Sequence, residues 1–272
     1  GKRHRGLATR KQGPENSFRA ISPEGLVFAV ERCVLSIKRY IMPLMMSPMT
    51  KSFQESPSGL SLFKDCPRCF WLEKVRYIKR PRGIFPSLPG GMDRVIKLYF
   101  DGFRSKGTLP PELASREEFR GLCLYKDLAQ LERWRDWKTG LEYFENGGRL
   151  FGALDDLLVA GDVCVPFDYK TKGSPTSEED ATKYYQTQLD CYALMLEANG
   201  MKTAGYGFLL YYSPREVGEN GRVIFEIQPI RIGTDIERAR SYFRRSAAVC
   251  EGPAPAASAN CEYCGWLNKF RK

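Results

Sequence analysis

The sequence predicts a mixed α/β or α+β fold in which helices pack on a central sheet. Helix-like segments come first along the chain, followed by a β-hairpin, a long helix, two further strands and a final helix, an order that favours such a layered arrangement. The 272 residues are 43% hydrophobic and 27% charged, which is ordinary for a globular protein with a sizeable core.

The first 55 residues are predicted to form a basic N-terminal extension, and residues 56–272 to form the folded domain. The extension holds ten Lys and Arg residues against four acidic ones, and its first part is polar and without periodicity, which is typical of disorder. Residues 24–42 have the spacing of one amphipathic helix, which Pro43 would end. The net charge of +10 favours a polyanionic partner, although a solvated basic tail explains it equally well.

Two helices are predicted before the sheet. The first covers residues 56–79, begins at Ser56 or Ser58, and would be kinked or divided at Pro67. The second covers residues 92–107 and ends at a glycine. The predicted apolar side of this second helix consists of Val95, Ile96, Tyr99 and Phe103.

Four β-like runs predict the sheet. The runs "GRLFGALDDLLVA" and "VCVPFDYKTKG" are separated by Gly161-Asp162, which is a two-residue hairpin signal. The runs "TAGYGFLLYYSP" and "GRVIFEIQPIRI" predict two further strands. We therefore expect the first two runs to pair as neighbours in the sheet.

Two more helices accompany these strands. Residues 176–200 give the clearest helical pattern, with Thr176 or Ser177 as the N-cap and acidic residues in the first turn. Thr234 and Glu237 have the spacing of a capping box, which predicts the start of a final long helix.

The run "VPFDYKTKG" carries Asp168 and Lys170 two positions apart, so both side chains project from the same face of a strand. In the predicted hairpin, Asp155 lies across the ladder on that face. Two carboxylates and an ammonium group at one point predict a Mg²⁺ or Mn²⁺ site, because these ions prefer oxygen ligands and also bind phosphate oxygens. Such an ion would activate water for phosphodiester hydrolysis, and Lys170 would stabilise the developing negative charge.

A cross-strand salt bridge on a solvated face is the alternative interpretation of these charges. The apolar neighbours Val163, Val165 and Phe167 favour a central strand instead. The following helix places Gln188 and Tyr192 four residues apart on one face, where both side chains can reach the same edge of the sheet.

Two CxxC pairs, Cys66-Pro-Arg-Cys69 and Cys261-Glu-Tyr-Cys264, predict a second kind of site. Four thiolates suit Zn²⁺ or an iron–sulfur cluster, and free thiols are the alternative. The chain has nine cysteines and shows no secretory signal, which predicts a reducing compartment, the cytoplasm. No run approaches the roughly 18 apolar residues of a membrane span, so no membrane partner is expected.

Four motifs in order resemble those of the PD-(D/E)XK nuclease superfamily. They are "SGLSLFKDCPRCFWL" from Ser58, Gly152-Ala-Leu-Asp155, Asp168-Tyr-Lys170-Thr171 and Gln188-Leu-Asp-Cys-Tyr192. They are most similar to the RecB-like branch, which includes the iron–sulfur exonucleases of CRISPR adaptation. The resemblance covers the chain from Ser58 onward. It implies a restriction-endonuclease-like central mixed sheet flanked by helices, with a helical N-terminal part.

The resemblance also implies a role for each of these residues. The catalytic set would be Asp155, Asp168, Lys170, Gln188 and Tyr192. Asp155 and Asp168 would bind Mg²⁺ or Mn²⁺, with the Tyr169 carbonyl as a third ligand, and Lys170 would be the catalytic lysine. The glutamine and the tyrosine would support the site and the DNA.

The chain departs from the pattern of the family at the histidine position and in the arrangement of its cysteines. Many relatives have a metal-binding histidine on the helix before the sheet, where this chain has Asp93; this residue is either an oxygen ligand to the metal or a helix N-terminal acid favoured by the dipole. Asp156 competes with Asp155 for the motif, but its side chain is predicted to point to the opposite face. Related iron–sulfur nucleases use one early and three late cysteines, whereas this chain has two and two, so a [4Fe–4S] cluster and Zn²⁺ both stay open.

The predicted function is that of a metal-dependent DNA nuclease, an exonuclease on single-stranded DNA or DNA ends in DNA repair, recombination or CRISPR adaptation. DNA is the expected partner, with a helicase or CRISPR adaptation proteins as further candidates. A catalytically inactive DNA-binding or scaffold protein with a cysteine-bound metal is the alternative. A thiol redox protein using Cys66 and Cys69 is a third interpretation, although no thioredoxin-like strand precedes the pair.

Overall fold

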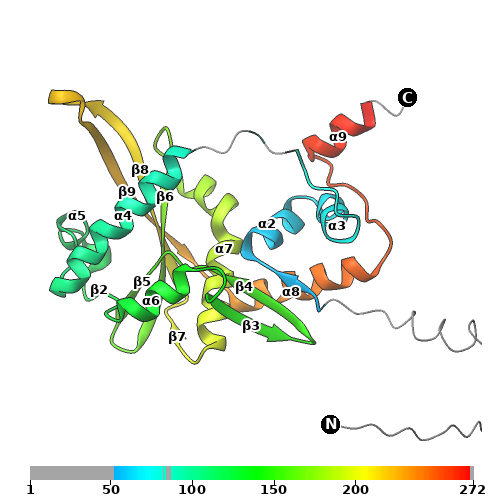
Figure 1. Cartoon of the computed structure of the whole chain (residues 1–272), viewed down its shortest axis with the longest axis horizontal. Helices are drawn as coiled ribbons and strands as arrows, with labels where there is room; N and C mark the ends of the chain where they lie inside the picture. Colours follow the sequence, from blue (N-terminus) through cyan, green and yellow to red (C-terminus); the bar gives the residue numbers. More distant parts are fainter. Residues whose placement is uncertain (1–51, 82, 84–86, 270–272) are drawn as a thin grey trace, which may run out of the picture. The chain divides into compact units, whose positions relative to one another are not determined.

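The computed structural model describes residues 52–81, 83 and 87–269, which belong to one compact unit beginning at Ser52 (Figure 1). The predicted helix over residues 24–42 lies outside the described residues. The first strand of the unit, β1 (Gln54–Glu55), lies before the predicted division at residue 55. Among the described residues, none of the helices is both long and apolar enough to cross a membrane.

A six-stranded mixed sheet forms the centre of the unit, with the order β2-β5-β6-β8-β9 and with β7 paired to β6 (Figure 1). Its strands are β2 (Cys123–Leu124), β5 (Asp156–Ala160), β6 (Val163–Thr171), β7 (Lys202–Thr203), β8 (Tyr206–Val217) and β9 (Val223–Gly233). The pairs β5–β6 and β8–β9 are antiparallel hairpins, whereas β6 and β8 run parallel. A parallel pair needs a crossover connection, and the long helix α7 (Glu178–Ala198) provides it.

A second sheet has three strands in the order β1-β4-β3, which adds β3 (Leu141–Glu145) and β4 (Gly148–Gly152) to β1. The run "GRLFGALDDLLVA" is therefore two strands in two sheets rather than one, and that prediction is wrong. The backbone N–H of Leu154 donates to the carbonyl of Trp134 at 2.8 Å instead of continuing a strand ladder. This interruption places Asp155 in the connection through which the chain passes from one sheet to the other.

The remaining described elements are helices. They are α2 (Pro57–Asp65), α3 (Pro67–Val75), α4 (Ser87–Lys106), α5 (Pro111–Ala114), η1 (Glu117–Phe119), α6 (Leu128–Arg135), η2 (Glu219–Gly221), α8 (Ile236–Glu251) and α9 (Glu262–Lys269). The prediction of a mixed sheet flanked by helices, as in restriction-endonuclease-like folds, is confirmed.

The helices cover both faces of the main sheet. On one face, Phe100 of α4 and Phe119 of η1 contact Phe167 of β6. On the other face, Leu189 of α7 shares a buried core with Leu209 of β8. Helices α2 and α8 and the small sheet pack against α7. Because side chains alternate along a strand, Asp168 and Lys170 project toward α7, away from α4.

Several helix boundaries follow the predicted chemistry. Ser56 caps α2, Ser177 caps α7, and Pro67 divides the predicted first helix into α2 and α3. The final helix differs: Asp235, not Thr234, is the N-cap, because the Asp235 carboxylate accepts hydrogen bonds from two backbone N–H groups of the first turn.

The predicted apolar side of the helix over residues 92–107 is only partly correct. Ile96 is buried, but Val95 and Tyr99 are 55% and 42% exposed. Phe100, which the pattern missed, is fully buried against the sheet. The helix also begins earlier than predicted, at Ser87.

Candidate active site and cysteine cluster

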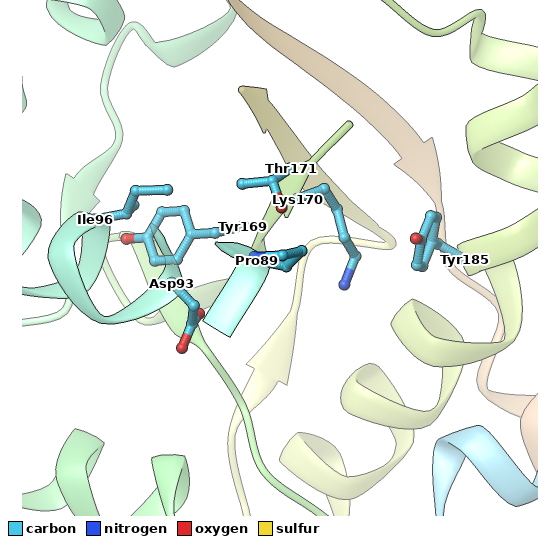
Figure 2. Close-up of a pocket in the computed structure, with 7 residues that line it drawn as sticks. All are labelled: Pro89, Asp93, Ile96, Tyr169, Lys170, Thr171 and Tyr185. Carbon is cyan, nitrogen blue, oxygen red and sulfur yellow. The ribbon is translucent and has the colours of Figure 1, made fainter. Parts of the chain in front are cut away.

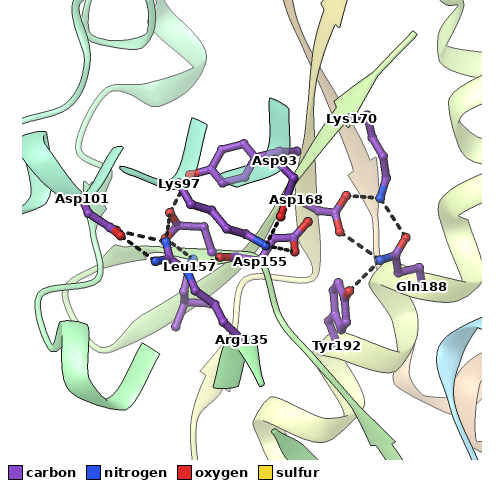
Figure 3. A network of polar contacts seen from close by, with 12 residues as sticks. Asp93, Lys97, Asp101, Arg135, Asp155, Leu157, Asp168, Lys170, Gln188 and Tyr192 are labelled. Atoms are coloured by element: carbon purple, nitrogen blue, oxygen red, sulfur yellow. Dashed lines mark hydrogen bonds and ion pairs between the residues drawn. The ribbon is translucent and has the colours of Figure 1, made fainter. Parts of the chain in front are cut away.

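The β5–β6 hairpin brings Asp155 and Asp168 together. Its turn is Gly161-Asp162, as predicted, and Gly161 has a φ of +61°, a conformation in which glycine carries no steric cost. In the register Asp156 lies opposite Phe167, so the next residues outward, Asp155 and Asp168, come opposite each other. Figure 3 shows their carboxyl groups side by side, and the Asp155 carboxylate acts electrostatically on Asp168.

Asp168 is fully buried and tied to two further side chains. Its Oδ1 accepts a hydrogen bond from Gln188 Nε2 at 2.9 Å, and its Oδ2 forms an ion pair with the Lys170 ammonium group. Within the described part of the chain, Oδ2 accepts no hydrogen bond of normal geometry. This oxygen therefore keeps a lone pair available for a ligand.

The two carboxylates differ in their proton affinity. Burial raises the pKa of Asp168 to about 7; the Lys170 ammonium group opposes this rise, and the Asp155 carboxylate adds to it. Burial acts on Asp155 in the same direction, but the ammonium groups of Lys97 and Lys170 hold the pKa of Asp155 below its ordinary value. The pair is thus poised to hold one proton or one cation between its oxygens.

Helix α7 holds Lys170 from the side. Lys170 Nζ donates to Gln188 Oε1 at 3.2 Å, and Gln188 Nε2 also donates to the Tyr192 hydroxyl at 2.6 Å (Figure 3). Nζ lies 4.5 Å from the centroid of the Tyr185 ring, a cation–π distance. Burial lowers the pKa of Lys170, but Asp168 and Asp155 raise it above its ordinary value, so this lysine is charged. Sequence reasoning missed Tyr185, which lies one helical turn before Gln188.

Asp93 reaches the site through a lysine that sequence reasoning also missed. Lys97 Nζ lies 2.9 Å from Asp93 Oδ2 and 2.8 Å from Asp155 Oδ1, between the two carboxylates. The spacing Asp93–Lys97, four residues apart on α4, was the available sequence signal. Asp93 therefore contacts Asp155 through an ammonium group, and its role as a metal ligand stays a prediction.

A pocket of about 250 Å³ opens beside these groups (Figure 2). Its walls come from the start of α4, the end of β6 and α7. The lining residues are Pro89, Asp93, Ile96, Tyr169, Lys170, Thr171 and Tyr185. A group that enters the pocket would therefore reach the Lys170 side chain.

The opposite face of the hairpin carries a separate set of charges, which we call the arginine cluster: Asp101, Arg104, Arg135, Asp156 and Tyr169. Arg104 Nη2 lies 2.6 Å from both oxygens of Asp156, and the Tyr169 hydroxyl donates to Asp156 Oδ2 at 2.5 Å. Arg135 binds Asp101 and Asp156 together. Asp156 thus points away from Asp155, as predicted.

The two CxxC pairs meet in one buried cluster. The sulfur atoms of Cys66, Cys69, Cys261 and Cys264 all lie within 4.8 Å of one another. The closest pairs are Cys69–Cys261 at 3.5 Å, Cys69–Cys264 at 3.6 Å and Cys66–Cys264 at 3.9 Å. Four buried sulfur atoms at one point can bind a metal ion or cluster.

The surroundings act unequally on the four sulfur atoms: burial raises the pKa of Cys69 and of Cys264, whereas Cys66 is stabilised as a thiolate. Arg80 Nη2 lies 3.5 Å from Cys261 Sγ. Burial raises the pKa of Cys66, but the backbone N–H groups of Cys69 and Ser258 outweigh this effect and lower it to about 6. Thiolates are the form that binds metal ions.

One family model matches more than half of the chain. The family model of the PD-(D/E)XK nuclease superfamily matches residues 93–268, a stretch that includes the hairpin, α7 and the second cysteine pair. The chain is also similar to the structure titled "Crystal structure of SSO0001", at 14% identity over 88% of this chain and 95% of that chain, with a TM-score of 0.42. No curated protein sequence matches.

At that TM-score the family assignment depends on the family model, which covers more than half of the chain. Membership of the RecB-like branch and the iron–sulfur cluster stay predictions. By the match over residues 93–268, the chain belongs to the PD-(D/E)XK nuclease superfamily.

Proposed function

We propose that the protein is a metal-dependent deoxyribonuclease, in which Asp155 and Asp168 bind the metal ion and Lys170 assists hydrolysis of the phosphodiester bond. One observation carries the proposal: in a chain of a nuclease superfamily, these three charged side chains converge beside a pocket. Two carboxylates side by side are costly unless a proton or a cation lies between them.

The donor set fits Mg²⁺ or Mn²⁺, the ions that PD-(D/E)XK nucleases generally use. Both side chains offer carboxylate oxygens, and one oxygen of Asp168 has a free lone pair. When bound, such an ion supplies a water of lowered pKa and neutralises phosphate charge. We keep the Tyr169 carbonyl and Asp93 as further candidate ligands.

The protein side chains would position the reacting groups. Lys170 would place its ammonium group against the attacking water or the developing negative charge, since Asp168, Gln188 and the Tyr185 ring fix its direction. Gln188 links Lys170 to Asp168, and Tyr192 accepts a hydrogen bond from the same amide. The two α7 residues would act by keeping the other groups in place.

For the substrate we propose single-stranded DNA or DNA ends. The small pocket beside Lys170, walled by the Tyr185 ring, supports entry of one strand rather than of an intact duplex. The net charge of +10 supports a polyanionic substrate. We propose DNA repair, recombination or CRISPR adaptation as the process in which such a nuclease acts, with a helicase or CRISPR adaptation proteins as candidate partners.

Cleavage of labelled single- and double-stranded DNA with Mn²⁺ or Mg²⁺ tests the proposal. We expect Asp168→Asn and Lys170→Ala to lose cleavage by at least about 100-fold while staying folded. Asp162→Asn, a change in the exposed turn of the same hairpin, is the matched control and should cleave as the wild type does. Salt-dependent DNA binding by a wild-type protein that never cleaves would instead support the inactive DNA-binding alternative.

For the cysteine cluster we propose a structural metal, with Zn²⁺ favoured over a [4Fe–4S] cluster. A tetrahedral ion with Zn–S bonds of about 2.3 Å puts the sulfur atoms about 3.8 Å apart, close to the 3.5–3.9 Å separations of the closest pairs. We expect about one zinc per chain and no visible absorption in protein purified without oxygen. Cys264→Ser should lose the zinc, whereas Cys250→Ser, outside the cluster, should keep it; a brown protein that contains iron would establish the cluster instead.

A further inference from the structure

Lys97 is the one cationic side chain that joins the candidate metal site from α4. Its Nζ lies within 3 Å of both Asp93 Oδ2 and Asp155 Oδ1, and its side chain is 19% exposed. An ammonium group thus occupies the space beside an oxygen that we propose as a metal ligand. A cation at that position repels any second cation that binds the same oxygens.

The site contains three carboxylates and two ammonium groups in direct contact. Asp93 and Asp155 share Lys97, and Asp168 pairs with Lys170. The formal charge of the set is therefore −1, too little to hold a divalent ion firmly while both lysines stay in place. Moving one ammonium group away from the carboxylates would make the site far more attractive to a divalent ion.

The two lysines are not held equally. Lys170 has partners besides the carboxylates, namely the Gln188 amide and the Tyr185 ring. The hydrogen bonds of Lys97 within the described region go to Asp93 and Asp155 alone. If one ammonium group moves away from Asp155 or Asp168, Lys97 gives up fewer interactions than Lys170 would.

We propose that Lys97 is a resident cation of the site, which leaves Asp155 when a divalent ion binds and stays tethered to Asp93. This inference rests on the proposed metal site at Asp155 and Asp168. This exchange replaces the candidate role of Asp93 as a metal ligand: Asp93, one turn earlier on the same helix, would anchor the lysine. Because Asp93 lines the same pocket as Lys170, the tethered ammonium group would face the substrate phosphate.

Binding of Mn²⁺ to the full chain tests this exchange without any cleavage step. The electron paramagnetic resonance signal of free Mn²⁺ disappears on binding and so gives the Kd directly. Lys97→Met keeps the length of the side chain but removes its charge, and we expect the Kd to fall by about ten-fold. Lys97→Arg keeps the charge and should bind Mn²⁺ as the wild type does.

Two further variants distinguish a failure of the proposed lysine exchange from a failure of the proposed metal site. Lys106→Met makes the same change at the end of the same helix, at a lysine stacked on Phe103, and should leave the Kd unchanged. Asp168→Asn removes a proposed ligand and should abolish binding. If Asp168→Asn abolishes binding but Lys97→Met does not tighten it, the exchange is refuted and the metal site stands. If the wild type binds no Mn²⁺, or Asp168→Asn binds it equally well, both proposals fail.

A measurement on the wild type covers the case in which Lys97→Met does not fold. Acetylation by an N-hydroxysuccinimide ester, followed by peptide mass spectrometry, reports how free each lysine is. We expect Mg²⁺ to increase acetylation of Lys97 several-fold relative to Lys106, and to have no such effect in Asp168→Asn. Equal acetylation of wild-type Lys97 with and without Mg²⁺ would refute the exchange.

Discussion

Asp155 and Asp156 are neighbours in the chain but belong to two different electrostatic environments. Asp155 lies on the side of the hairpin that carries Asp168 and Lys170, is 22% exposed at its side chain, and has lysine ammonium groups around it. Asp156 faces α4, is fully buried, and accepts hydrogen bonds from Arg104, Arg135, a tyrosine and its neighbour's backbone N–H. The alternation of side chains at the start of β5 separates the two.

The two environments differ in the type of cation: arginine guanidinium groups surround Asp156, whereas lysine ammonium groups surround Asp155. A guanidinium group is planar and presents several fixed donors, so the arginine cluster forms a rigid, satisfied network. A lysine ammonium group is a point charge on a flexible stem and can move to a new partner. The hairpin therefore combines a face that fixes the backbone with a face whose charges can rearrange around a ligand.

The largest effect on stability should come from removing the central carboxylate of the arginine cluster. Asp156→Ala leaves two arginines close together without their shared carboxylate, and we expect it to reduce the free energy of unfolding by about 3–5 kcal/mol. Urea unfolding followed by circular dichroism measures this change. Asp162→Ala, in the exposed turn of the same hairpin, should have no measurable effect; a stable Asp156→Ala protein would show that the arginine cluster is not structural.

A smaller effect, on the rate of cleavage, should follow from removing a side chain that positions Asp168 and Lys170. Gln188→Ala removes the amide that joins Asp168 to Lys170, and we expect kcat for DNA cleavage to fall by about 10–100-fold with little loss of stability. Gln186→Ala is the matched control, because Gln186 lies on the same helix and bonds to Asp190 and the Gly233 carbonyl instead. Equal rates for the two variants would remove Gln188 from the site.

The smallest expected effect is a change with pH in the free energy of unfolding, which arises from Asp168 on the lysine-bearing face. The pKa of Asp168 is raised to about 7 in the folded protein, above the ordinary value of about 4, so the folded state holds this proton more tightly than the unfolded state. The stability that Asp168 contributes is thus present below about pH 4 and is lost as the pH rises toward 7.

Asp168→Asn mimics the protonated acid and should therefore gain stability relative to the wild type as the pH rises. Without added divalent ions, we expect the difference between the two proteins to change by on the order of 1 kcal/mol between about pH 5 and about pH 7.5. Urea unfolding at the two pH values measures it. A difference that does not depend on pH would show that Asp168 is ionised throughout.

The hairpin and its charged face could be predicted because they depend on local rules. Gly161-Asp162 specifies the turn, the turn sets the register, and the register brings Asp155 opposite Asp168. The long helix that carries Gln188 was equally accessible, since its serine cap and acidic first turn are adjacent in sequence.

The partners of these residues could not be predicted in the same way. Lys97, Arg104 and Arg135 are charged residues on helices, which a pattern assigns to solvent, yet each lies against the hairpin. Their burial depends on how α4 and α6 pack, which is a tertiary property. The passage from the small sheet to the main one at residues 153–155 was missed although Gly152 and Asp155 are turn-forming residues, because a single glycine or aspartate within an apolar run does not by itself specify a break between strands.

The cysteine cluster sets an order of events in the synthesis of the chain. Cys69 and Cys261 are 192 positions apart, so at about 5–20 residues per second the first pair exists for about 10–40 s before the second. During that interval the main sheet can form around β6, whereas the early thiols have only half of their ligand set. The metal that we propose for this cluster would therefore bind last, once the chain has been translated through Cys264.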